Sequence, residues 1–326
     1  MSTHGVPAVS SHSEQLPLVS VWLITYNHES YIAQAIESVL MQETSFTVEL
    51  VIGEDFSSDR TREIVQAYKD KYPDRIRLFL SPRNLGMVPV LKPTFAMCRG
   101  KYVAMLDGDD YWTDPRKLQK QVELMEADVT CNVSFHNVQV YDERTEQYTQ
   151  PPNPAWASLS HNLDLHEFIS LGNPIYTVSA IFRRPIEELP AYYYELPYPD
   201  LAIYYLVLAT GGKACYLPEV MGVYRLHAKG AFTSTSWAER RQHALLFLDV
   251  VQQHLPVRYH QQLAIERQIV LYDLLLVKLR YGNAKAALHY FRSIDWTYVP
   301  PHISTFSRKH RYTATLLRRL GKLTAN

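Results

Sequence analysis

The chain contains 326 residues, of which 47% are hydrophobic and 20% are charged, a composition that excludes the disordered and fibrous classes. Lysine and arginine together number 33, as do aspartate and glutamate, so the sequence lacks the positive excess typical of a nucleic-acid-binding protein. At roughly 150 residues per domain, the length predicts two domains or one large one.

Strands and helices alternate in the first 126 residues, after a polar tail at 1–17. We expect strands over residues 19–24, 48–52, 76–80 and 102–106, and helices over 32–40, after the N-cap Asp59, and over 91–98 from near Pro93. This alternation is typical of a doubly wound α/β fold with a mainly parallel sheet.

The second part of the chain mixes signals and then becomes helical. Strands are expected over 133–141 and 178–182, a loop at 151–154, and a helix over 201–209 that ends before two glycines. From residue 236 the apolar spacing is helical. The predicted division is therefore a tail at 1–17, an α/β domain at 18–235 and a helical C-terminal region at 236–326.

The cysteines and the N-terminus favour a cytoplasmic protein. Cys98, Cys131 and Cys215 are too few and too widely spaced for a disulfide framework or a Cys-x-x-Cys zinc pair. Residues 1–15 lack the basic start and apolar run of a signal peptide, and no apolar stretch is long enough to span a bilayer.

The strongest chemical signal is the run Asp107-Gly108-Asp109-Asp110, directly after the predicted strand 102–106. Carboxylates so close together repel one another unless they are solvated or surround a cation. An EF-hand calcium loop is excluded, because Trp112 and Leu118 occupy the positions that need Gly and Glu. An acidic surface turn is the alternative interpretation.

A second acidic run, Glu54-Asp55 followed by Asp59, ends the second predicted strand, so both runs should line one edge of the sheet. Its carboxylates suit a nucleobase or ribose, and helix capping is the alternative. The sequence contains no P-loop, no Gly-x-Gly-x-x-Gly after the first strand, no His-Glu-x-x-His and no Gly-x-Ser-x-Gly. Their absence argues against P-loop kinases, dinucleotide oxidoreductases, zincins and serine hydrolases of the nucleophile-elbow type.

Several motifs in order resemble the family-2 glycosyltransferases of the GT-A fold. They are Val19-Ser20-Val21-Trp22-Leu23-Ile24-Thr25-Tyr26-Asn27-His28, Ala35-Ile36-Glu37-Ser38-Val39-Leu40-Met41-Gln42, Glu54-Asp55-Phe56-Ser57-Ser58-Asp59-Arg60-Thr61, Asn84-Leu85-Gly86 and Leu106-Asp107-Gly108-Asp109-Asp110. The third departs from the family's Asp-Asp-Gly-Ser-x-Asp-x-Thr at Glu54 and Phe56. The resemblance is dense over 18–126 and thins by about residue 232.

The resemblance implies a nucleotide-sugar site in 18–126 and an acceptor half in 127–235. The implied nucleotide-sugar residues are Thr25, Tyr26, Asn27, Glu54, Asp55, Asn84, Gly86, Asp107 and Gly108. Asp109 is implied as a ligand of Mn²⁺ or Mg²⁺, with His227, from Tyr224-Arg225-Leu226-His227, completing the shell. Arg225 would meet a phosphate or an acidic group of the acceptor. A purely structural role is the alternative for His227.

An inverting transfer also needs a base that removes the proton of the acceptor hydroxyl. The resemblance places it just before a helix in the second half, which selects Asp200 in Tyr198-Pro199-Asp200-Leu201. An N-cap role for Asp200 is the alternative. Tyr192, Tyr193, Tyr194 and Tyr198 precede it, and core or interface packing is the preferred interpretation of these rings.

The C-terminal segment 307–326 carries six basic residues and no acid, with leucines at helical spacing. Such a helix suits an anionic membrane, and packing on its own domain is the alternative. The sequence thus predicts a cytoplasmic, metal-dependent, inverting glycosyltransferase of surface polysaccharide assembly that uses a UDP-sugar and a glycan or lipid-linked acceptor, with peripheral membrane contact as an option. A sugar nucleotidyltransferase and a non-catalytic nucleotide-sugar-binding assembly protein are the alternatives.

Overall fold

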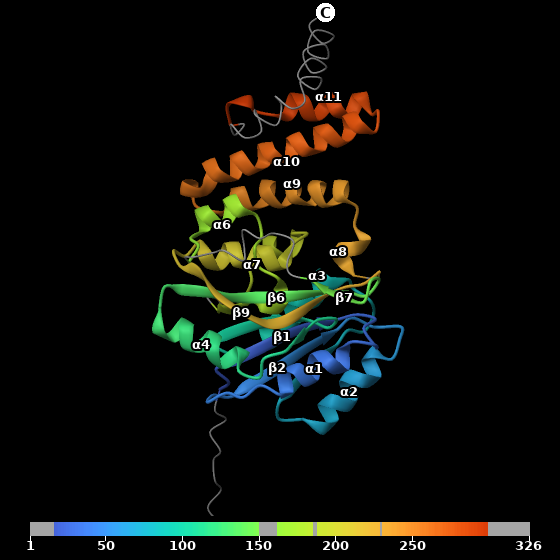
Figure 1. Cartoon of the computed structure of the whole chain (residues 1–326), viewed down its shortest axis with the longest axis vertical. Helices are drawn as coiled ribbons and strands as arrows, with labels where there is room; N and C mark the ends of the chain where they lie inside the picture. The colour runs from blue at the N-terminus through green and yellow to red at the C-terminus, as the bar shows by residue number, and fades with distance from the viewer. Residues whose placement is uncertain (1–15, 150–161, 185–187, 229, 299–326) are drawn as a thin grey trace, which may run out of the picture.

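The computed structural model describes residues 16–149, 162–184, 188–228 and 230–298 (Figure 1). One mixed sheet divides these residues into layers, with α1 (Ile32–Leu40) and α2 (Thr61–Lys71) below it and α3 (Met87–Met97) and α7 (Pro199–Leu208) above it. The loop predicted at 151–154 and the basic segment 307–326 lie outside the described residues. Within the described part of the chain, no helix combines the length and the apolar character that crossing a bilayer requires.

The strands of the sheet follow the order β3-β2-β1-β4-β8-β6-β9-β5, with β7 paired to β6. Their bounds are β1 Val19–Thr25, β2 Val48–Glu54, β3 Ile76–Leu80, β4 Tyr102–Asp107, β5 Tyr111–Trp112, β6 Cys131–Asp142, β7 Gln147–Thr149, β8 Ile181–Arg183 and β9 Lys213–Leu226. The first four, β3-β2-β1-β4, are all parallel, whereas β8 joins β4 and β6 by antiparallel pairing. The predicted α/β class and the parallel first half are confirmed.

Alternation along β1 explains why helices cover both faces of the sheet. Val21 and Leu23 are fully buried against the layer of α1 and α2, whereas Trp22, between them, is buried in the core on the opposite face. Successive side chains of a strand point to opposite faces, so a continuous apolar run needs cover on both sides. Burial of each such side chain contributes about 1.5–3 kcal/mol.

The helix predicted over 91–98 and the strand predicted over 178–182 differ from the structure. Helix α3 spans Met87–Met97 rather than 91–98, and Pro93 lies inside it rather than at its start. The predicted strand over 178–182 is a 3₁₀ turn at Thr177–Ser179 followed by β8. The turn forms because polar groups near residue 179 bond locally to the backbone, which competes with strand pairing.

Strand β9 was not expected from the sequence, although it is the longest strand in the described part of the chain. Pro218 and Glu219 interrupt its apolar pattern, and its parallel register with β6 is irregular between His136 and Val138. An irregular strand of this kind lacks the clean period-two signal from which a strand is predicted. Its C-terminal end carries the Tyr224-Arg225-Leu226-His227 motif to the edge of the sheet.

The predicted helical C-terminal region is present and follows the sheet. Ser236 and Glu239 form a capping box at the start of α9 (Trp237–His254), which is followed by α10 (His260–Arg280) and α11 (Ala284–Ser293). Phe247 of α9 belongs to the same core as α7, while α10 and α11 share a separate small core. The three helices stack above the sheet with α9 innermost (Figure 1). The exact domain boundaries stay a prediction.

Candidate active site

The site lies where four parallel strands end at one edge of the sheet. In the strand register, Thr25 of β1 stands opposite Glu54 of β2, which stands opposite Leu80 of β3, and Ile24 stands opposite Asp107 of β4. The loops that follow these strands therefore leave the sheet side by side. Carboxyl ends of parallel strands are the usual ligand position in open α/β sheets.

Asp55 joins the loops that follow β2 and β3. The backbone N–H groups of Leu85 and Gly86 donate to its two carboxylate oxygens, each at 2.8 Å, and Asn84 donates its side-chain amide to the Asp55 carbonyl at 3.3 Å. Gly86 has φ +81°, a value that favours glycine. The predicted residues Asp55, Asn84 and Gly86 are thus brought together, and Asp55 is 2% exposed.

Glu54, the last residue of β2, is held by groups of the loop and helix that follow it. It is fully buried, and its oxygens accept hydrogen bonds from Arg62 Nε and from the backbone N–H of Ser57, both at 2.5 Å. Its contacts are therefore with the protein itself. The following Phe56 has φ +58°, a left-handed conformation that disfavours a bulky side chain. That backbone requirement explains why the family pattern has glycine at this position.

The loop after β1 packs directly against the Asp107–Asp110 run. Thr25 is buried with its Oγ1 3.3 Å from Nδ1 of His28, and a Cβ added to Gly108 would lie 2.5 Å from Thr25 Oγ1. Asn27 has φ +54° and accepts a hydrogen bond from the Ser58 N–H at 2.8 Å. Neighbouring Tyr26 is 42% exposed. Small size at Gly108 is therefore what allows the two loops to touch.

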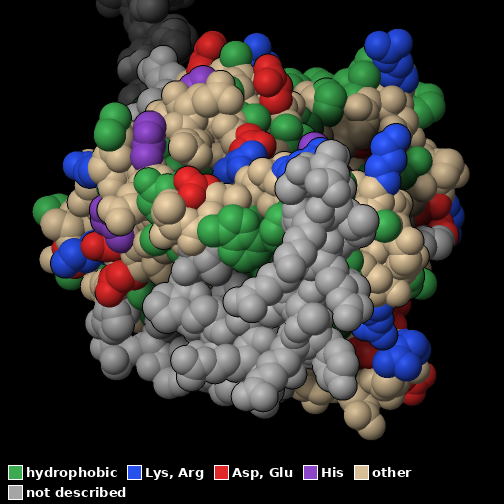
Figure 2. Space-filling view, turned by 90° about the horizontal axis from the view of Figure 1, so that it is seen from above, with side chains coloured by type: hydrophobic (Ala, Val, Ile, Leu, Met, Phe, Trp, Pro, Cys, Tyr) green, Lys and Arg blue, Asp and Glu red, His purple; other side chains and the backbone are tan. Residues whose placement is uncertain are grey.

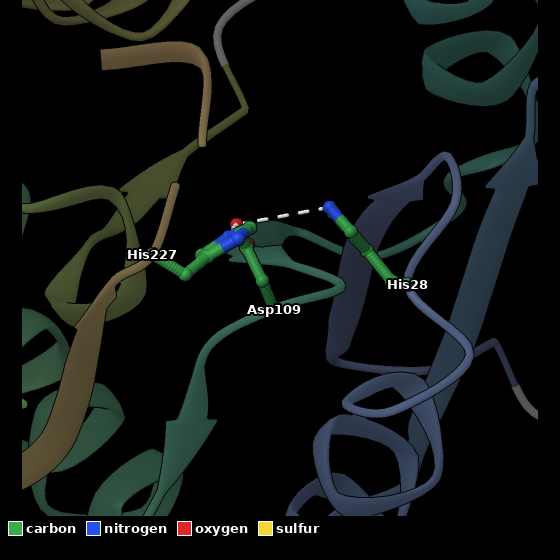
Figure 3. Close-up of side chains that lie close together, drawn as sticks. All are labelled: His28, Asp109 and His227. Atoms are coloured by element: carbon green, nitrogen blue, oxygen red, sulfur yellow. Dashed lines mark hydrogen bonds and ion pairs between the residues drawn. The ribbon is translucent and has the colours of Figure 1, made fainter. Parts of the chain in front are cut away.

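Three side chains from distant parts of the chain form a candidate metal centre (Figure 3). His227 Nε2 lies 2.9 Å from Asp109 Oδ2, and His28 Nε2 lies 3.7 Å from the same oxygen. One ligand atom from each residue falls within 4.8 Å of the others. Two imidazole nitrogens and one carboxylate oxygen form a donor set that suits a divalent transition metal such as Mn²⁺. His28 was not predicted as a metal ligand; its position beside Asn27 in a strand-end loop was the available signal.

The charges of this group are unevenly distributed. Burial alone would raise the pKa of Asp109, but the hydrogen bond to His227 and the charges of both histidines outweigh it and lower that pKa. Burial, reinforced by Asp109 and Asp200, raises the pKa of Asp107 to about 8. Burial also lowers the pKa of His28. Asp109 is therefore ionised more readily than Asp107. The neighbouring imidazole of His28 is favoured in its neutral form, which is the form that binds a metal.

Arg225 braces the acidic loop from β9. Its backbone N–H donates to Asp110 Oδ1 at 2.8 Å, and its guanidinium donates to the Asp109 carbonyl and to the Gln34 side chain. The guanidinium carbon also lies 4.5 Å from the centre of the Tyr111 ring. These contacts engage Arg225 with protein groups, so its predicted contact with a phosphate or an acceptor stays a prediction. No role was predicted for Asp110; its hydrogen bond from the Arg225 N–H links the acidic loop to β9.

Asp200 is the second residue of α7, not its N-cap as the alternative interpretation proposed. The helix begins at Pro199 rather than at residue 201, because proline is well suited to the first helical position, and Tyr198 is the capping residue. Asp200 Oδ2 accepts a hydrogen bond from Asn173 Nδ2 at 3.3 Å. Its charge raises the pKa of Asp107, so the predicted base lies within electrostatic reach of the acidic loop.

The preceding tyrosines are packing residues, as the sequence analysis preferred. Tyr193 is buried in the core, Tyr192 stacks on His254 with ring centres 3.9 Å apart, and the Tyr198 hydroxyl donates to the Arg240 carbonyl at 2.8 Å. They tie the segment before α7 to α9.

Comparison with known proteins agrees with this geometry. The profile described as glycosyl transferase family 2 matches residues 20–189, more than half of the chain. This chain belongs to glycosyl transferase family 2. The match includes the strand-end loops after β1, β2, β3 and β4, while His227 and Asp200 lie beyond it.

Among curated relatives, this glycosyltransferase is similar to the uncharacterized protein Rv1520 of Mycobacterium tuberculosis (strain ATCC 25618 / H37Rv). The two are 36% identical over 230 residues, which cover 69% of this chain and 63% of Rv1520. The chain thus spans less than two thirds of that relative.

Two solved structures share the GT-A fold with this glycosyltransferase. Staphylococcus aureus TarS 1-349, in complex with UDP-GlcNAc, is matched with a TM-score of 0.62 at 17% identity, over 86% of this chain and 82% of that one. The mannosyltransferase PcManGT from Pyrobaculum calidifontis, in complex with GDP-Man and Mn²⁺, is matched with a TM-score of 0.58 at 17% identity, over 95% and 84% of the two chains. The predicted GT-A fold with a helical C-terminal region is confirmed.

Proposed function

We propose that this family-2 glycosyltransferase transfers a sugar from a nucleotide donor to an acceptor hydroxyl with inversion at the anomeric carbon, in the cytoplasm. The observation that carries the proposal is the convergence of His28, Asp109 and His227 at the carboxyl edge of the sheet, with Asp200 near enough to interact with the charge of Asp107. The donor is proposed to be UDP-linked. The acceptor is proposed to be a glycan or a lipid-linked glycan of surface polysaccharide assembly.

The loops after β1, β2 and β3 would form the nucleotide pocket. Support comes from Asp55, whose carboxylate is held rigidly by two backbone N–H groups, and from the exposed ring of Tyr26 next to buried Thr25. TarS was crystallised with UDP-GlcNAc and PcManGT with GDP-Man. Those two donors make UDP and GDP the nucleotides to compare in the first binding experiment.

His28, Asp109 and His227 would hold the divalent metal, Mn²⁺ or Mg²⁺. PcManGT carries Mn²⁺ in its complex, and the donor set here fits such an ion. When bound, the ion would supply positive charge that stabilises the departing nucleoside diphosphate. The neutral form of His28 and the ionised form of Asp109, which their surroundings favour, are the forms that bind a metal.

Asp200 would act as the base. Its carboxylate would accept the proton of the acceptor hydroxyl while the hydroxyl oxygen forms a bond to the anomeric carbon. The bond from that carbon to the diphosphate oxygen breaks at the same time, and its electron pair leaves with the nucleoside diphosphate. Attack opposite the leaving group inverts the anomeric centre.

Calorimetric titration with UDP and with GDP, each with and without Mn²⁺, tests the proposal. We expect metal-dependent UDP binding that Asp109→Ala abolishes. Asp249→Ala is the matched control, because Asp249 lies on α9 and pairs with Arg267 at 2.6 Å, outside the site. GDP binding without UDP binding would replace the donor but retain the site. Absence of binding by either nucleotide would reject the enzymatic proposal.

A further inference from the structure

The carboxylate of Asp200 faces groups from four parts of the fold. Asn173 contacts it from the segment between α6 (Leu165–Leu171) and β8, and Tyr204 lies one turn further along α7 on the same face. Tyr193 of the 3₁₀ helix Ala191–Glu195 and Asp107 of β4 are close enough to interact with its charge, as is Tyr198 at the start of α7. Of these groups, Asn173 is the one whose side chain donates a hydrogen bond to Asp200.

The local backbone fixes the orientation of Asn173. Its Oδ1 accepts a hydrogen bond from the Ile175 N–H at 3.1 Å, which turns its amide nitrogen toward Asp200 Oδ2 at 3.3 Å. Side-chain turns of this kind are typical of asparagine. Gly172 precedes it at φ +75° and the rigid Pro174 follows, so the chain is held on both sides. The side-chain amide of Asn173 is therefore held in the orientation that donates to the Asp200 carboxylate.

Burial and hydrogen bonds act on the ionisation of Asp200 in opposite directions. Burial raises its pKa, whereas hydrogen bonds from the backbone N–H groups of Leu201 and Asp200 and from the Asn173 side chain lower it. Tyr204 is fully buried, and its hydroxyl is directed to Met105 Sδ at 3.8 Å, a weak acceptor, rather than to the carboxylate. The Tyr193 hydroxyl is buried without a hydrogen-bond partner among the described residues. Asn173 thus adds a neutral side-chain donor to these backbone donors, and it too favours the carboxylate form.

We infer that Asn173 is a positioning residue for the reaction: its side-chain amide holds the Asp200 carboxylate in the orientation and ionised state that accept the acceptor's proton. This inference deepens the proposed function and rests on it. Asn173 itself touches no reacting atom. Removal of its amide should therefore slow proton transfer and leave nucleotide binding unchanged.

Two substitutions in the full chain separate positioning from a merely structural role. Asn173→Asp retains an oxygen for the Ile175 N–H, but it replaces the donor to Asp200 with a second carboxylate. Asn173→Ala removes both contacts. If Asn173 has only a structural role, Asn173→Asp should be harmless and Asn173→Ala harmful. If it positions Asp200, kcat/KM at neutral pH should be lower in Asn173→Asp than in Asn173→Ala, by at least about tenfold.

The pH profile supplies the second readout. Because ionised Asp200 is the active form, kcat/KM rises as pH passes its pKa, and loss of the Asn173 donor moves that rise to higher pH. We expect a shift of about one pH unit for Asn173→Ala, a tenfold change in the ionisation constant. Asn283→Ala is the matched control, since Asn283 caps α11 through the Ala286 N–H at 3.0 Å and should leave the profile unmoved.

A direct titration keeps the two proposals distinguishable. Carbon-13 NMR of the side-chain carboxyls, assigned with Asp200→Asn, measures the pKa of Asp200 without turnover. An unmoved Asp200 titration in Asn173→Ala, or wild-type kcat/KM in Asn173→Asp, would overturn the inference while Asp200 stays the base. Full transfer activity in Asp200→Asn would instead reject the base assigned in the proposed function.

Discussion

The two halves of the α/β domain build their parts of the site in different ways. Residues 18–126 place side chains at the ends of consecutive parallel strands, so neighbours in the fold are predictable from the chain order. In residues 127–235, Arg225 and His227 reach the same edge on β9, through an irregular parallel pairing with β6. The site residues of the first half are therefore positioned by consecutive parallel strands. Those of the second half depend on the pairing of two strands that lie far apart in the chain.

Asp200→Asn has the largest expected effect, and it tests whether the second half supplies the base. We expect transfer to fall by about 10²- to 10⁴-fold, because the amide cannot accept the acceptor's proton. Binding of UDP with Mn²⁺ should stay at the wild-type level, since the nucleotide loops belong to the first half. Steady-state kinetics together with calorimetry measure the two effects, and a parallel loss of nucleotide binding would contradict the separation of roles.

The metal centre contains one histidine from each half: His28 comes from the first half and His227 from the second. We expect His28→Ala and His227→Ala each to weaken Mn²⁺ binding by about tenfold to a hundredfold, since each removes one donor. His289→Ala on α11 is the matched control. Calorimetry or Mn²⁺ electron paramagnetic resonance measures the affinity. Wild-type affinity in His28→Ala would leave the centre to Asp109 and His227.

Within the first half, Gly108 tests how closely the loops after β1 and β4 pack. We expect Gly108→Ala to lower the free energy of unfolding by about 1–3 kcal/mol, because the new methyl would overlap Thr25 and His28. Gly282→Ala is unsuitable as a control, because Gly282 has φ +70°. Ala104→Gly, or another small change in the core, serves instead as the reference for the free energy measured by urea denaturation. Unchanged stability would show that the two loops separate easily.

The smallest effect is expected at Phe56. Its φ of +58° suits glycine, so Phe56→Gly should raise the free energy of unfolding by up to about 1 kcal/mol. Loss of the contact between the Phe56 ring and the Arg62 guanidinium, 4.9 Å apart, offsets part of this gain. Urea denaturation followed by fluorescence measures the balance. A clear destabilisation would mean that the ring contact outweighs the backbone strain.

Much of the site was predictable, but with characteristic gaps. Asp55, Asn84, Gly86, Asp107 and Asp109 follow predicted strands, so their convergence could be expected from the chain order. Other outcomes could not be read from residue type. One is the buried, paired state of Glu54, which depends on Arg62, the second residue of α2.

The alternation of strand and helix patterns by itself determined the α/β class and the parallel first half, and the strand-end carboxylates indicated the edge that carries the candidate site. Period-two and helical spacing encode burial locally, and parallel strands share one carboxyl edge. Tertiary structure alone decided that His28 joins Asp109 and His227, and that Asn173 meets Asp200. Residues 118 and 27 positions apart in the chain come into contact through β9 and α7, and no local pattern encodes such contacts.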